Sequence, residues 1–150
     1  MAFRFPLEAV FHFRKSVEHQ QELRLRSANQ QVARLRRALD QLDEGMRQVH
    51  ARENQELSVG TTAAELRFAL SSEQSIRQQR REVEREMVRL ENLRDQQQRI
   101  FRQARRERET FESLREQQFR EYERGAVRRE QRQLDEIFLL RQAFARRQHG

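Results

Sequence analysis

The feature that most constrains this chain is an unbroken heptad pattern between residues 25 and 49. A repeat that averages 3.5 residues keeps one narrow apolar stripe facing a partner helix, as in a coiled coil. Most residues between these apolar positions are polar or charged, so the helix cannot bury its stripe without a partner. We call this stripe the seam. Its members are Leu25, Ala28, Val32, Leu35, Leu39, Leu42, Met46 and Val49.

The composition favours long helices over a round globule. Hydrophobic residues make up 35% and charged residues 37% of the chain, whereas globular domains average roughly 45–50% and about 25%. One proline and four glycines leave few points at which a helix would break. We therefore expect an all-α fold: an antiparallel two-helix coiled coil, or helical hairpin, that forms a single domain over residues 1–150.

Local signals divide this hairpin into three parts. Pro6 suits the first turn of a helix, so the first helix is expected over about residues 6–57. A loop and a short helix should occupy about 58–72, because Thr62 and Glu65 have capping-box spacing. Ser72 would then cap a last helix over about 73–147. Three apolar residues of the short helix are expected to cover the open end of the seam: Leu66, Phe68 and Leu70.

The last helix carries its own, less regular apolar stripe. Its inward positions are Ile76, Val83, Met87, Leu90, Phe101, Ala104, Phe111, Leu114, Phe119 and Tyr122, with Arg80, Arg94, Gln97 and Arg108 intruding. Such polar intrusions lower stability but can determine register. If the chain folds back about residues 58–72, the numbers of paired residues sum to about 130. Leu25–Val49 would then lie against Val83–Ala104, and Leu7 and Phe11 near Phe119 and Tyr122.

In this arrangement the last helix continues past Gly125 as an overhang without a partner. The overhang carries a cluster of apolar residues: Leu134, Ile137, Phe138, Leu139, Leu140 and Phe144. An exposed apolar cluster of this kind usually marks a binding site. We expect a partner protein here, and the alternatives are a longer N-terminal path or self-association that covers the cluster.

The positive charge is concentrated in one block. The chain has a formal net charge of +7, and residues 77–108 contain eleven Arg against six acids. Such a block could bind nucleic acid, acidic lipid or an acidic protein face. We favour a solvated helix face with intrahelical ion pairs. The acids are interleaved with the Arg residues, and only Phe101 offers an aromatic ring for base stacking.

No motif in the chain indicates catalysis. There is no cysteine and no Gly-rich phosphate loop. His12 and His19 are seven residues apart and read as solvated surface residues, while His50 and His149 have no partners nearby in sequence. We expect no catalytic, cofactor-binding or metal-binding residue, no cofactor and no small-molecule substrate. The absence of a long apolar run and of a signal-peptide core favours an intracellular soluble protein.

Three segments resemble one known family. Phe3 to Glu8, followed by Val10, Phe11 and Arg14, resembles the N-terminal signature of the flagellar export protein family FliJ. Leu114 to Tyr122 is similar to the family's L-x-E…Y segment. Arg129 to Glu136 is similar to its E-Q-K-x-L-D-E segment, with Arg132 in place of the usual Lys. The similarity runs along the whole chain. The Arg-rich block and the Ile137–Leu140 run depart from the family's pattern.

The resemblance implies a non-enzymatic stalk and adaptor of the flagellar type III export apparatus, needed for motility. FliJ proteins bind the hexameric export ATPase FliI and the gate protein FlhA, and they escort export chaperones. They are cytoplasmic, at the inner face of the membrane at the flagellar base. Carried onto this chain, the ATPase-binding end comprises Phe3, Phe5, Leu7, Gln131, Leu134, Asp135 and Glu136. The overhang adds Ile137 and Phe138.

Other functions remain open at this point. The stalk of a virulence secretion system would share the architecture, although the Phe3, Phe5 and Leu7 opening favours the flagellar version. A basic coiled coil that binds nucleic acid or acidic surfaces would use residues 77–108. A plain dimeric scaffold would pair its seam between two chains.

Overall fold

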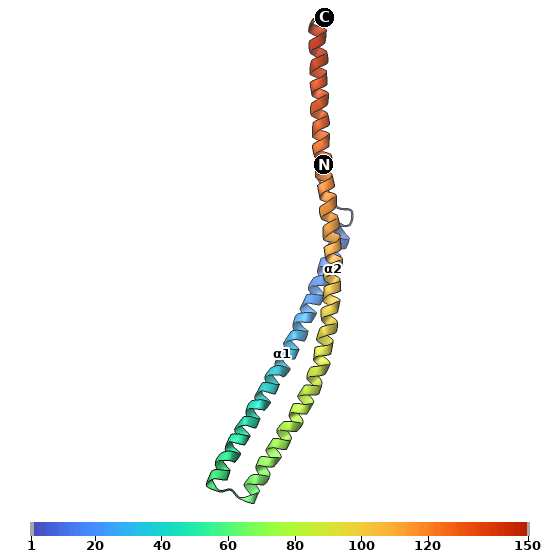
Figure 1. The fold of residues 1–150 in the computed structure, drawn as a ribbon. Coiled ribbons are helices and arrows are strands. Elements are labelled where there is room, and N and C mark those ends of the chain that lie inside the picture. Colours follow the sequence, from blue (N-terminus) through green and yellow to red (C-terminus); the bar gives the residue numbers. More distant parts are fainter. Residues whose placement is uncertain (1, 150) are drawn as a thin grey trace. The chain divides into compact units, whose positions relative to one another are not determined.

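Two long helices account for nearly all of the fold. The computed structural model describes residues 2–149 and contains α1, Glu8–Val59, and α2, Ala63–His149 (Figure 1). Residues 60–62 join them, and the described residues contain no strand. The prediction of an all-α fold with two long helices packed against each other is confirmed. Cα packing divides the chain into a hairpin unit, His19–Gln103, and an end unit, Met1–Glu18 with Ala104–Gly150.

The turn between the helices is short because Gly60 ends α1 abruptly. Gly60 has φ +102°, in the left-handed region that side chains rarely adopt. Its N–H donates to the Glu56 carbonyl at 2.8 Å, which closes the last turn of α1. Two residues later the predicted capping box begins α2. Glu65 N–H donates to Thr62 Oγ1 at 3.2 Å, and Thr62 N–H donates to Glu65 Oε2 at 3.3 Å.

The expected separate short helix is wrong, because α2 runs without a break from Ala63. Ser71 and Ser72 lie inside this helix, where serine is tolerated although it also favours caps. Leu66, Phe68 and Leu70 do not cover the seam, since their exposed fractions are 41%, 71% and 56%. The buried residue of this turn of the helix is Ala69. The prediction of one domain over residues 1–150 stays a prediction.

The seam is the buried face of α1 in the hairpin unit. All eight of its predicted residues are buried or half-buried, and Val32 is the most buried of them at 2% exposure. Opposite residues of α2 are also half-buried: Ile76, Val83, Met87 and Leu90. The core is thus a thin double stripe, as the heptad pattern predicted.

The pairing register differs from the expected one. Asp43 pairs with Arg80 and His50 with Glu73, and in the end unit Glu8 pairs with Arg115. The two residue numbers add to 123 in each of these pairs, and the other interhelix pairs give sums from 118 to 127, against the expected value of about 130. The difference is one heptad, which leaves apolar residues opposite apolar residues. The expected register is wrong because the turn lies at residues 60–62 and not across 58–72.

The end unit contains an aromatic cluster around Phe3. Its ring contacts Phe119 edge-on at a centroid distance of 5.2 Å and Tyr122 at 5.5 Å. Phe5 and Phe11 are buried, with exposed fractions of 6% and 4%. The expected register places Leu7 and Phe11 beside Phe119 and Tyr122. In the observed register, which is shifted by one heptad, Phe3 lies beside Phe119 and Tyr122 instead.

Candidate partner-binding end

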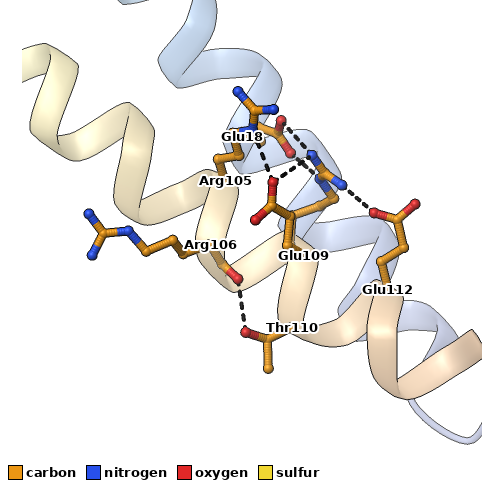
Figure 2. Close-up of polar contacts among 7 residues, drawn as sticks. Glu18, Arg105, Arg106, Glu109, Thr110 and Glu112 are labelled. Carbon is orange, nitrogen blue, oxygen red and sulfur yellow. Dashed lines mark hydrogen bonds and ion pairs between the residues drawn. The ribbon is translucent and has the colours of Figure 1, made fainter. Parts of the chain in front are cut away.

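A charged cluster in the end unit joins α1 to α2. Arg108 Nε donates to Glu18 Oε2 at 2.5 Å, and the side chains of both residues are 19% exposed. Arg108 also pairs with Glu112 on its own helix and lies 3.9 Å from Glu109 Oε1. Glu18, Glu109 and Glu112 therefore surround one guanidinium (Figure 2). The hydrogen bond to Glu18 is the largest cause that raises the pKa of Arg108, so this residue stays charged.

The other polar intrusions on the α2 stripe are also paired. In the hairpin unit Gln97 Nε2 donates to Gln21 Oε1 at 2.6 Å, and Arg80 pairs with Asp43. Arg94 pairs with its neighbour Asp95. Two of these three intrusions therefore find partners on α1, consistent with a role in register.

Beyond the aromatic cluster, α2 continues without a packing partner. We call residues 127–149 the exposed segment, because every one of them is exposed. Its large apolar side chains have exposed fractions between 48% and 70%: Val127, Leu134, Ile137, Phe138, Leu139, Leu140 and Phe144. Large apolar side chains that are exposed together in this way are typical of a binding surface.

The apolar residues of the exposed segment point in every direction around the helix. Ile137 to Leu140 are four consecutive residues, and successive side chains of a helix differ by about 100°. All four are at least 48% exposed. On one side of the helix an open groove runs from this apolar run to the following turns. It is lined by Ile137, Leu140, Arg141 and Phe144. A helix that is apolar on all sides is normally enclosed, so a flat surface on one side would leave part of it in water.

The tip of the segment is basic. Six Arg stand against three acids over residues 127–149, and Arg146, Arg147 and His149 lie in the last turn of α2. Basic residues there also complement the negative end of the helix dipole. A protein that encloses this segment would therefore match it best with apolar walls and acidic residues near the tip.

The structure divides the predicted ATPase-binding residues into two groups. Phe3 and Phe5 pack inside the end unit, and Leu7 is 37% exposed just before α1. The second group lies in the exposed segment: Gln131, Leu134, Asp135, Glu136, Ile137 and Phe138. Leu134 follows Tyr122 by twelve residues, which is about 18 Å along a helix. Leu140 and Phe144 belong to the same surface; the sequence places them in the apolar cluster of the overhang, but they are not among the predicted ATPase-binding residues.

Comparison with known proteins identifies the family. The model of the family described as flagellar FliJ protein matches residues 3–149. The chain belongs to the FliJ family. FliJ membership makes it a component of the flagellar type III export system. No curated protein and no solved structure matches the chain.

Six of the eleven Arg residues in the Arg-rich block of this FliJ protein form ion pairs. Arg77, Arg80, Arg89, Arg94, Arg105 and Arg108 each pair with a carboxylate. The hydrogen bond from Arg89 lowers the pKa of Glu86 and raises that of Arg89 itself. These contacts support a solvated, ion-paired helix face. Among residues 2–149 no helix is long and apolar enough to span a bilayer.

Proposed function

We propose that this chain is a non-enzymatic stalk of the flagellar export apparatus, and that its exposed segment inserts into the ring of the hexameric export ATPase FliI. The observation that carries this proposal is the apolar surface on all sides of α2 at Ile137 to Leu140. A ring surrounds an inserted helix and can cover all of that surface at once. The ATPase would hydrolyse ATP. This chain would position the ATPase or couple it to the rest of the export apparatus.

The two groups of predicted residues have different tasks in this proposal. Leu134, Ile137 and Phe138 would contact the ATPase directly. Phe3 and Phe5 would hold the N-terminal residues against α2, because their rings are occupied within the end unit. Leu7 is open enough to contact the rim of a partner.

The proposal also includes an adaptor role at the export gate. We assign contacts with FlhA and with export chaperones to this chain because its family acts in export. The chain would work in the cytoplasm, at the inner face of the membrane. We expect no small-molecule substrate or cofactor.

The test compares two double substitutions. Ile137→Asp with Phe138→Asp places two charges on the surface that the ring would enclose, and we expect at least a tenfold loss of ATPase affinity, since each buried apolar side chain contributes about 2 kcal/mol. Val88→Asp with Leu93→Asp is the matched control. Those residues are 59% and 45% exposed on the hairpin unit.

Affinity is measured by pull-down and calorimetry with the purified ATPase, and helix content by circular dichroism. We expect both variants to keep the helix content of the parent chain. Undiminished binding by the first variant would refute the insertion of this end. Equal losses in both variants would show that added charge alone weakens the complex.

A further inference from the structure

Three metal-ligating side chains meet close to the turn of the hairpin unit. His50 and Glu53 are three residues apart on α1, so they share one face of the helix. Glu73 reaches them from α2, and its Oε1 lies 3.3 Å from His50 Nε2. One ligand atom from each of the three residues lies within 4.8 Å of the other two. We expected no partner for His50 from the sequence, and the turn brings Glu73 of α2 to it.

We propose that His50, Glu53 and Glu73 form a binding site for a divalent transition-metal ion such as Zn²⁺. An imidazole nitrogen with two carboxylate oxygens is a donor set that Zn²⁺ accepts, at about 2.0–2.2 Å for each ligand. Atoms that already lie within 4.8 Å of one another can reach one ion through small changes in side-chain rotamer. Three protein ligands leave a coordination position for water.

The burial of Glu73 supports a cation at this place. Glu73 is 9% exposed and is the one buried charged residue among residues 2–149. A buried carboxylate is costly unless a positive charge or hydrogen bonds compensate for it. Arg77 Nη2 lies 3.7 Å from Glu73, but its side chain is 58% exposed. A metal ion between His50, Glu53 and Glu73 would compensate the charge more directly.

The site is open to solvent on one side. Glu53 lines an open cavity of about 380 Å³ together with Val49, Phe68, Ala69 and Ser72. Of the three proposed ligands only Glu53 lines this cavity, so an ion could approach the site from the Glu53 side. Other charged groups line the same cavity: Arg52 and Glu56 from α1, and Glu65 from α2. Arg77 of α2 lies beside Glu73.

An ion held here would join the two helices beside the turn. Two ligands come from the last three turns of α1 and the third from the first three turns of α2. Binding to the folded state alone stabilises that state in proportion to the logarithm of the metal concentration. The inferred site therefore crosslinks α1 and α2 near the turn and stabilises their pairing in the hairpin unit. It is independent of the proposed function of the exposed segment.

The experiment titrates the full-length chain, treated with chelator and dialysed, with Zn²⁺ by calorimetry. We expect one ion per chain and a rise in the thermal unfolding midpoint that chelator reverses. His50→Gln should weaken the Zn²⁺ affinity at least about tenfold. Loss of a residue that only orients a metal ligand already costs about this much, and His50 would be a ligand itself. His12→Gln is the matched control. His12 pairs with Glu8 at 3.2 Å on α1, and metal binding should not depend on it.

A second substitution separates a metal site from a simple salt bridge. Arg77→Gln removes the positive charge that competes for Glu73, so it should strengthen Zn²⁺ binding. If Zn²⁺ binds at a site that does not include Glu73, Arg77→Gln should leave the Zn²⁺ affinity unchanged. The inference is overturned if the parent chain takes up no ion, if His50→Gln binds as tightly as the parent chain, or if Arg77→Gln does not bind more tightly.

Discussion

At the scale of single residues, the Arg108 side chain joins three carboxylates in the end unit. It contacts Glu18 across the helix pair and two further carboxylates on α2. The Arg108 side chain is 19% exposed, so solvent screens these contacts only partly. Removing it would leave three carboxylates close together with one fewer cation between them.

We expect Arg108→Ala to lower the free energy of unfolding by about 2 kcal/mol, because charge-assisted hydrogen bonds across partly buried surfaces contribute on this scale. Arg106→Ala is the control. Its side chain points away from the cluster in Figure 2, where only its backbone carbonyl accepts a bond from Thr110. Urea titration followed by circular dichroism measures both variants. Equal effects would show that the cluster adds nothing beyond the helix propensity of arginine.

Sequence spacing identified Arg108 as a polar intrusion but not its partner. The partner lies ninety residues away along the chain, and only the register brings the two together. In contrast, Thr62 and Glu65 form the hydrogen bonds expected from their spacing. That motif is complete within four residues and depends on no other part of the fold.

Among the elements, the turn depends on the conformation of one glycine. Gly60 has φ +102°, and a Cβ added there would meet no atom within 4 Å, so backbone strain and not crowding opposes a side chain. Gly125 lies within α2, also with open space around it. The two glycines should therefore respond in opposite directions to the same substitution.

We expect Gly60→Ala to destabilise the chain by about 1 kcal/mol and Gly125→Ala to stabilise it by about 0.5–1 kcal/mol. Thermal unfolding measured by circular dichroism gives both values. A neutral result for Gly60→Ala would mean that the turn can adopt another conformation without cost.

The capping box sets where α2 begins. Thr62→Ala removes the oxygen that accepts from Glu65 N–H, and we expect a loss of about 1 kcal/mol in the free energy of unfolding. Thr62→Ser keeps that oxygen and should retain most of the stability. If the two variants are equally unstable, the hydroxyl is not the group that matters.

For the molecule as a whole, the main consequence of the turn is the register of the two helices. The apolar positions of a heptad seam match their partner equally well after a shift of seven residues, whereas paired polar intrusions such as Arg80 with Asp43 do not. The short connection at residues 60–62 selects one of these matches. The same register brings Phe3 to Phe119 in the end unit and His50 to Glu73 in the hairpin unit.

Cysteine pairs test this register directly, because the chain has no cysteine of its own. Asp43→Cys with Arg80→Cys should form a disulfide within one chain on mild oxidation. Asp43→Cys with Met87→Cys corresponds to the register in which paired numbers sum to about 130, and its two positions lie about 10 Å out of step, too far for a disulfide. Non-reducing electrophoresis separates the products. A linked dimer from the first pair would indicate that the seam pairs between two chains.

The sequence by itself determined the helices, the seam, the capping box and the apolar residues at the end of α2. Each of these follows from residues within a few positions of one another, where propensity and periodicity act. Only the tertiary structure decided the absence of a separate short helix, the register, and the approach of Glu73 to His50 and Glu53. These depend on where the chain reverses, and a seven-residue repeat carries no information about that point.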